Sequence, residues 1–77
     1  MLAIEPLKTR LRKCREASGI TLLQLAEVTG LTFQEVEGFE KGREPSLAAL
    51  VKIGEAYGMA VTTLLQHTEY SQVGGEE

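Results

Sequence analysis

The chain has 77 residues, of which 43% are hydrophobic and 25% are charged, and its net charge is −3. This length suffices for one small domain and leaves little room for a deep catalytic pocket. No apolar run approaches the roughly 20 residues that cross a bilayer, and the first residues lack the pattern of a secretory signal. The single cysteine cannot form an internal disulfide, so we expect a cytoplasmic domain without membrane contact.

The charged residues are unevenly distributed along the chain. All acidic residues are glutamates and they dominate from Ile20 onward, which is unusual for a protein that binds nucleic acid. A basic face of the first helix either lies against phosphate or is simply solvated. Charge clusters in general are more often solvated helix faces. The basic residues that gather there are Lys8, Arg10, Arg12, Lys13 and Arg15.

The first expected helix covers residues 6–18. Pro6 suits a first helical turn, because its missing N–H is not needed there, and Gly19 is a typical residue at which a helix stops. Apolar residues recur between them at helical spacing, and Cys14 is interpreted as one of the core residues rather than a nucleophile. These core residues are Leu7, Leu11 and Cys14.

Two short helices follow, and each begins with a capping box. Thr21 with Gln24, and Thr32 with Glu35, have the spacing at which side chains cap the first turn of a helix. Gly30 separates the two helices. Their expected core residues are Leu25, Ala26 and Val28 in the first helix, and Val36 and Phe39 in the second, which should end near Lys41 and Gly42.

Residues 45–65 predict two more helices. Ser46 follows Pro45 at the start of the fourth helix and Gly58 closes it. Its apolar side is expected to consist of Leu47, Leu50, Val51, Ile53 and Tyr57. A last short helix begins at Thr62 or Thr63. The sequence has no strand pattern, so it predicts an all-α, five-helix domain over residues 1–67 and a flexible acidic tail over residues 68–77.

Residues 21–42 carry the pattern that points to a function: two short helices joined by a tight turn at Gly30. Ala26 is small, so the two helices can approach closely, and Leu31 and Val36 fill the angle between them. In a helix-turn-helix of this kind, the first helix crosses the DNA backbone and the second enters the major groove.

The residues that match a known family run through most of the chain. They are Leu11, Arg15, Gly19, Ile20, Thr21, Leu25, Ala26, Gly30, Leu31, Thr32, Val36, Phe39, Glu40, Lys41, Gly42, Pro45, Ser46, Leu47, Leu50 and Leu64. In this order and spacing the chain resembles the lambdoid repressor and Cro-like family, also called XRE-type helix-turn-helix proteins. The resemblance implies a compact repressor-like fold and a structural ion pair between Arg15 and Glu40, whose loss should lower the melting temperature.

The resemblance also implies which residues face DNA. They are Thr21, Leu22, Thr32, Phe33, Gln34, Glu37, Gly38, Lys41 and Arg43. The sequence departs from the family pattern at several of these positions. Leu22 and Phe33 are apolar where polar residues are common, and Gly38 lies where a longer side chain often enters the groove. Glu35 and Glu37 are acidic and would be repelled by phosphate unless they face away or accept from cytosine.

The first hypothesis is a sequence-specific DNA-binding transcriptional regulator that acts as a homodimer. Gln34 would pair with adenine and Phe33 would pack against a thymine methyl group. The phosphates would be held by Thr21, Thr32, Lys41 and Arg43. The dimer contact would use the apolar residues Met59, Val61, Leu64 and Leu65.

The second hypothesis is a protein-binding module, such as an antitoxin, an antiactivator or a co-regulator. It rests on an apolar patch of Leu22, Leu23 and Phe33, because contiguous exposed apolar residues tend to mark interfaces. The alternative for Leu23 is that it packs against the first helix, and Phe33 would then partly cover the turn.

No constellation for catalysis is found. His67 has no cysteine or second histidine at metal-ligand spacing, and Gly74-Gly75 lies outside any phosphate-binding loop pattern. The glutamates of the third helix do not converge on one site. We therefore expect no enzyme activity, no metal and no cofactor.

Overall fold

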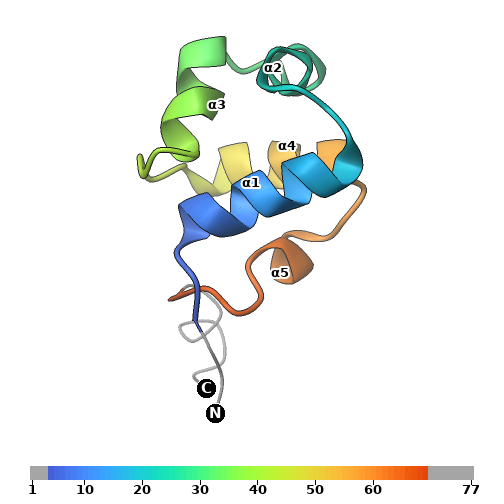
Figure 1. Ribbon diagram of the computed structural model, residues 1–77. Helices are drawn as coiled ribbons and strands as arrows, with labels where there is room; N and C mark the ends of the chain where they lie inside the picture. Colours follow the sequence, from blue (N-terminus) through green and yellow to red (C-terminus); the bar gives the residue numbers. More distant parts are fainter. Residues whose placement is uncertain (1–3, 70–77) are drawn as a thin grey trace.

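The computed structural model describes residues 4–69. These residues form α1 (Leu7–Ser18), α2 (Leu22–Thr29), α3 (Phe33–Phe39), α4 (Leu47–Tyr57) and α5 (Val61–Leu64). Figure 1 shows α2 and α3 on one side of α1 and α5 on the other, with α4 behind α1. The predicted all-α fold is confirmed, and no helix among the described residues is long and apolar enough to cross a membrane.

Both predicted capping boxes are present. The Thr21 side chain accepts from the Gln24 backbone while the Gln24 side chain accepts from the Thr21 backbone, and Thr32 and Glu35 do the same. Each box satisfies backbone N–H groups that lack a partner in the first turn of a helix. The caps therefore fix where α2 and α3 begin.

The helix ends differ from prediction by a few residues. α2 continues to Thr29, one residue past Val28, where the helix was expected to end, and Gly30 then takes the left-handed conformation with φ 77°. α3 ends at Phe39, before the expected Lys41, and α5 starts at Val61. The turn at Gly30 requires a positive φ, which glycine adopts without the steric cost that a Cβ atom imposes.

Two clusters of buried side chains hold the helices together. The smaller one joins α2 to α3 through Leu25, Ala26 and Val36. The larger one joins α1, α4, α5 and the end of α3, and it includes Leu7, Leu11, Cys14, Phe39, Ala49, Leu50, Ile53 and Leu64. Leu31 and Tyr57 pack against both clusters, so the helix pair is anchored to the rest of the domain.

Three predicted core residues are exposed instead. Val28 is 67% exposed, Leu47 is 66% exposed and Val51 is 40% exposed. The prediction was wrong because each helix buries a narrower face than its apolar residues suggest. In α2 the buried face ends at Thr29, whose hydroxyl donates to the Leu25 carbonyl oxygen over 2.7 Å.

The two ends of the described chain pair with each other. The Glu5 N–H donates to the His67 carbonyl oxygen over 2.8 Å, and Glu5 and Thr68 form a parallel bridge. Thr68 is fully buried, so the folded part extends past residue 67, where the domain was predicted to end. Residues 70–77 of the predicted tail lie outside the described residues.

His67 has a backbone φ of 64°, which is left-handed and costs a residue with a Cβ atom about 1 kcal/mol. We expect His67→Gly to raise the free energy of unfolding by about 0.5 kcal/mol, because glycine relieves this strain while its greater freedom when unfolded offsets part of the gain. Urea denaturation measures the change. His67→Ala keeps the Cβ atom and serves as the control. Equal free energies of unfolding in the two variants would mean that the Cβ atom at position 67 causes no strain.

Candidate nucleic-acid interface

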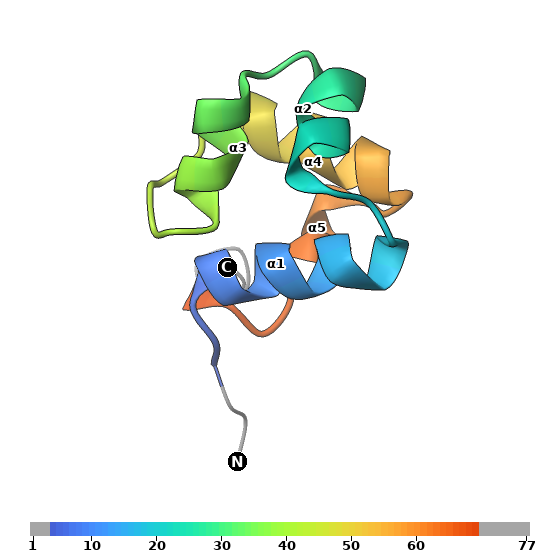
Figure 2. The same cartoon turned by 45° about the horizontal axis from the view of Figure 1, so that its top comes forward.

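The turn between α2 and α3 is fixed by the side chain of Thr29. Its Oγ1 atom donates to the Leu25 carbonyl oxygen and accepts from the Leu31 N–H over 3.2 Å. Ala26 and Val36 are buried between the two helices, and Figure 2 shows the helices joined by the short connection. This packing presents α3 as a rigid element on the outside of the domain.

One face of α3 is available to a ligand. Val36 and Phe39 fill the opposite face, which is buried. Phe33, the first residue of the helix, is 42% exposed, and Gln34 is exposed beside it. Residues four apart lie on the same side of a helix, so Gly38 lies one turn after Gln34 on this face. The predicted base-reading residues are therefore brought together on one surface.

Thr21 and Thr32 lie at the starts of the two helices and are both exposed. Each side-chain oxygen accepts one backbone hydrogen bond within its capping box. A threonine hydroxyl also has one proton to donate, and accepting a bond at the cap leaves that proton available. Both residues thus combine a structural role with the capacity to donate to a phosphate oxygen.

Leu22 and Leu23 have different environments. Leu22 is partly buried against the cluster that joins α2 to α3, whereas Leu23 is 58% exposed. The predicted apolar patch therefore reduces to Leu23 and Phe33 as its well-exposed members. Leu23 does not pack against α1 as a buried residue, which was the alternative considered for it.

Lys41 is accompanied by an acidic side chain. Its Nζ atom lies 3.5 Å from Glu37 Oε2, one turn back along the chain. Both side chains are accessible, with exposed fractions of 73% for Lys41 and 37% for Glu37. Glu37 thus offsets the positive charge that Lys41 would offer to a phosphate, and such exposed pairs are easily broken.

Most basic residues of α1 are engaged within the protein. Arg10 donates to the carbonyl oxygens of Leu64 and Thr63 over 3.0 and 2.7 Å, at the end of α5. The ion pairs of this helix are Arg12 with Glu16, Lys13 with Glu5, and Arg15 with Glu40. The structure therefore favours a structural and solvated role for this cluster over a phosphate-binding helix face.

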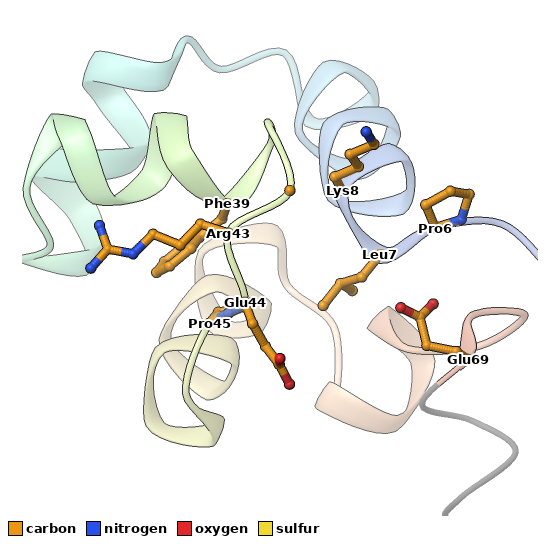
Figure 3. Close-up of a pocket in the computed structure, with 9 residues that line it drawn as sticks. Pro6, Leu7, Lys8, Phe39, Arg43, Glu44, Pro45 and Glu69 are labelled. Atoms are coloured by element: carbon orange, nitrogen blue, oxygen red, sulfur yellow. The ribbon is translucent and has the colours of Figure 1, made fainter.

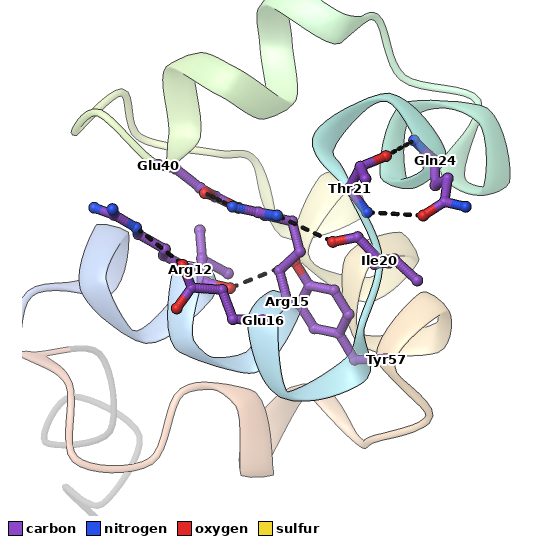
Figure 4. Close-up of polar contacts among 9 residues, drawn as sticks. Arg12, Arg15, Glu16, Ile20, Thr21, Gln24, Glu40 and Tyr57 are labelled. Atoms are coloured by element: carbon purple, nitrogen blue, oxygen red, sulfur yellow. Dashed lines mark hydrogen bonds and ion pairs between the residues drawn. The ribbon is translucent and has the colours of Figure 1, made fainter.

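The expected pair of Arg15 and Glu40 is present and is bidentate. Arg15 Nε lies 2.7 Å from Glu40 Oε2, and Arg15 Nη2 donates to Oε1 over 3.1 Å. Arg15 also donates to the Ile20 carbonyl oxygen, and Tyr57 lies next to it (Figure 4). The hydrogen bond with Glu40 raises the pKa of Arg15. The pair ties the end of α3 to α1 and is structural, because little of it is exposed.

A hollow of about 290 Å³ lies where the loop after α3 passes the start of α1 (Figure 3). Its lining mixes Leu7, Phe39 and Pro45 with charged side chains such as Lys8 and Glu69. Because this hollow combines apolar side chains with side chains of both charges, its lining indicates no particular class of ligand. Among the described residues no group of three histidine, cysteine or acidic side chains could hold a metal ion.

Cys14 and His67, considered above for chemistry, lie apart from the exposed face of α3. Cys14 is buried in the larger core cluster, and desolvation raises the pKa of its thiol. A raised pKa leaves less thiolate, which is the nucleophilic form. His67 is an exposed residue whose backbone is used in pairing the chain ends.

Two capped helices joined by a glycine turn, with the second helix exposed, define a helix-turn-helix domain. A family model described as Helix-turn-helix matches residues 11–64. The chain belongs to this family and is of the XRE type, as its matching residues indicated.

Known proteins that resemble the chain include a transcriptional regulator and a solved protein complex. One is YonR of Bacillus subtilis (strain 168), an uncharacterized HTH-type transcriptional regulator derived from the SPbeta prophage. It is 35% identical over 60 residues, which cover 77% of this chain and 56% of YonR. The other is the solved complex of SinR protein and SinI protein, with a TM-score of 0.74 and 26% identity. That match covers 87% of this chain and 65% of the solved one, so the chain spans only part of both proteins.

Proposed function

We propose that the chain is a DNA-binding transcriptional regulator that inserts α3 into the major groove. The observation that carries this proposal is the exposed face of α3, where Phe33 and Gln34 lie on a helix held rigidly by its cap and by the packing of Val36. An amide side chain can pair bidentately with adenine, and an apolar ring can pack against a thymine methyl group. Membership of the helix-turn-helix family supports the same proposal.

Four residues are proposed to position the domain on the DNA backbone. Thr21 and Thr32 would donate from the starts of α2 and α3, and Lys41 and Arg43 would supply positive charge. Glu37 opposes this charge beside Lys41. We therefore propose modest affinity for each protomer and a dimer that binds a two-fold symmetric site.

The apolar residues predicted for the dimer contact pack within the domain itself. Leu64 is fully buried, while Leu65, Met59 and Val61 pack against the domain's own core, so these residues do not provide a free apolar surface. Exposed apolar side chains are found instead on α4, where Leu47 and Val51 lie one turn apart. Sedimentation at increasing concentration tests the dimer, and Leu47→Glu tests this face.

The DNA proposal is tested by selecting bound fragments from randomised duplex DNA over a salt series. We expect a two-fold symmetric site to be enriched and the affinity to fall steeply with salt, because phosphate contacts release counterions. No retention at low salt would overturn the proposal. Retention without any enriched sequence would leave only non-specific binding.

The second candidate is a protein-binding module, and one observation favours it. Leu23 and Phe33 are both exposed on the helix pair, in a chain whose net charge is −3. The solved SinR structure was determined in complex with a protein, SinI. If DNA selection fails, Leu23→Ser and Phe33→Ser should each weaken binding to a protein partner. If DNA selection succeeds and Phe33→Ser weakens DNA binding while Leu23→Ser does not, the first proposal is supported instead.

A further inference from the structure

Arg43 lies over Gly38 on the exposed face of α3. A Cβ atom at position 38 would lie 3.3 Å from Arg43 Cδ and 3.6 Å from Arg43 Cβ. The first distance is tighter than an ordinary van der Waals contact, so the arginine stem occupies the space that a side chain at position 38 would use. A residue from the following loop thus covers the gap that glycine leaves in the recognition helix.

The backbone holds this arrangement in place. The Arg43 N–H donates to the Gly38 carbonyl oxygen over 2.9 Å, and the Lys41 N–H donates to the same oxygen over 2.9 Å. The loop after α3 is thereby folded back onto the last turn of the helix. Arg43 is one of the residues that line the hollow in Figure 3, and its guanidinium points away from Lys8 and Glu69.

The charge of Arg43 is less engaged than that of its neighbours. Lys41 and Arg15 each have a carboxylate within 4.0 Å, whereas no ion pair within residues 4–69 involves Arg43. Glu35 is close enough to interact at longer range. Its pKa is lowered chiefly by the hydrogen bond from the Thr32 backbone, and also by the charge of Arg43. The guanidinium is therefore near α3 and not locked into an intramolecular pair there.

We propose that Arg43 reads a base, through the space left by Gly38, and does not merely hold a phosphate. The inference rests on the proposed DNA-binding function and deepens it. The guanidinium fork matches the O6 and N7 acceptors of guanine in the major groove. Because Gly38 lies one turn after Gln34, the guanine should lie close to the base pair that Gln34 contacts. Gly38 is then a specificity-determining residue that acts by making room for Arg43.

The experiment compares the sites selected by the full chain and by two variants, Arg43→Lys and Gly38→Gln. Arg43→Lys keeps the charge and loses the fork, so we expect about tenfold weaker preference for guanine at one base pair with an unchanged salt dependence. Gly38→Gln places a long side chain where the arginine stem lies, so the same preference should weaken. Thermal unfolding of both variants verifies that they are folded.

The outcomes separate this inference from the function on which it rests. Loss of guanine preference at the same base pair in both variants supports it. If the parent selects a site and Arg43→Lys keeps every base preference, Arg43 is a phosphate contact and the inference is overturned. If the parent selects no site, the proposed DNA-binding function is overturned, and the inference about Arg43 is overturned as well. If the guanine preference is lost in Gly38→Gln but kept in Arg43→Lys, Arg43 does not read that base.

Discussion

Arg15→Ala is expected to lower the free energy of unfolding by about 3 kcal/mol, because it leaves the Glu40 carboxylate stranded in a site where only 8% of its side chain is exposed. The change also removes the hydrogen bond to the Ile20 carbonyl oxygen, just before α2. A domain of this size has a total stability of roughly 4–12 kcal/mol. Urea denaturation measures the loss, and we expect it to be among the largest for any single charged residue.

Arg12→Ala is the matched control, since Arg12 lies on the same helix and also pairs with a glutamate. Its Nε atom lies 3.4 Å from Glu16 Oε2, and the two side chains are 64% and 58% exposed. Exposed pairs contribute at most about 1 kcal/mol, so this variant should remain close to the parent. Similar losses in the two variants would mean that burial of the Glu40 carboxylate does not matter. When Arg15→Ala is combined with Glu40→Gln, the loss of stability should be smaller than the sum of the losses in the two single variants.

Gln34→Ala is expected to relax sequence preference at one base pair by roughly tenfold or more, because a bidentate contact discriminates by about 1–3 kcal/mol. Gln34 is exposed at the start of α3 and takes no part in the Thr32 capping box, so the variant should fold as the parent does. The measurement is competition between DNA duplexes that differ at single positions of the selected site. The salt dependence should stay the same, because no phosphate contact is removed.

Gln66→Ala provides the control for this prediction. Gln66 is exposed just after α5, and Figure 1 places α5 on the opposite side of α1 from α3. Its replacement should change neither preference nor affinity. Uniform weakening across all sequences in Gln34→Ala would assign Gln34 to the DNA backbone and not to a base.

The parts of the fold that follow from local chemistry could be predicted. A threonine followed three residues later by glutamine or glutamate satisfies its own helix start, so Thr21 and Thr32 identified α2 and α3 without tertiary information. The ion pair of Arg15 and Glu40 could be predicted only from the family resemblance. The two residues are 25 positions apart, and no local pattern joins them.

The extent of burial could not be predicted from apolar spacing. Leu47 and Val51 fit the stripe expected for α4, yet the buried face of that helix runs through Ala49, Ile53 and Gly54. A Cβ atom at position 54 would lie 2.9 Å from the Met59 carbonyl oxygen, so the backbone after α4 approaches the helix there. Glycine adds nothing to a hydrophobic pattern, so the buried position of Gly54 and this close approach could not be predicted from the sequence.

The DNA-facing residues stay a prediction, and the contacts among them could not be derived from the sequence. The sequence placed Gly38 and Arg43 in the DNA-facing set, but contact between them depends on the loop folding back after α3. The basic cluster near the start of the chain was similarly ambiguous. Only the three-dimensional arrangement shows that Arg10 bonds the carbonyl oxygens at the end of α5.

The pairing of Glu5 with His67 and Thr68 makes the domain a candidate for circular permutation. Because these segments are adjacent, a short linker could join them while a new opening is made in the exposed connection at Glu44, between α3 and α4. The same adjacency places the two described ends beside the hollow that Pro6, Glu69 and Arg43 all line, so a bulky group attached at Glu5 or Glu69 would lie close to the loop after α3 (Figure 3).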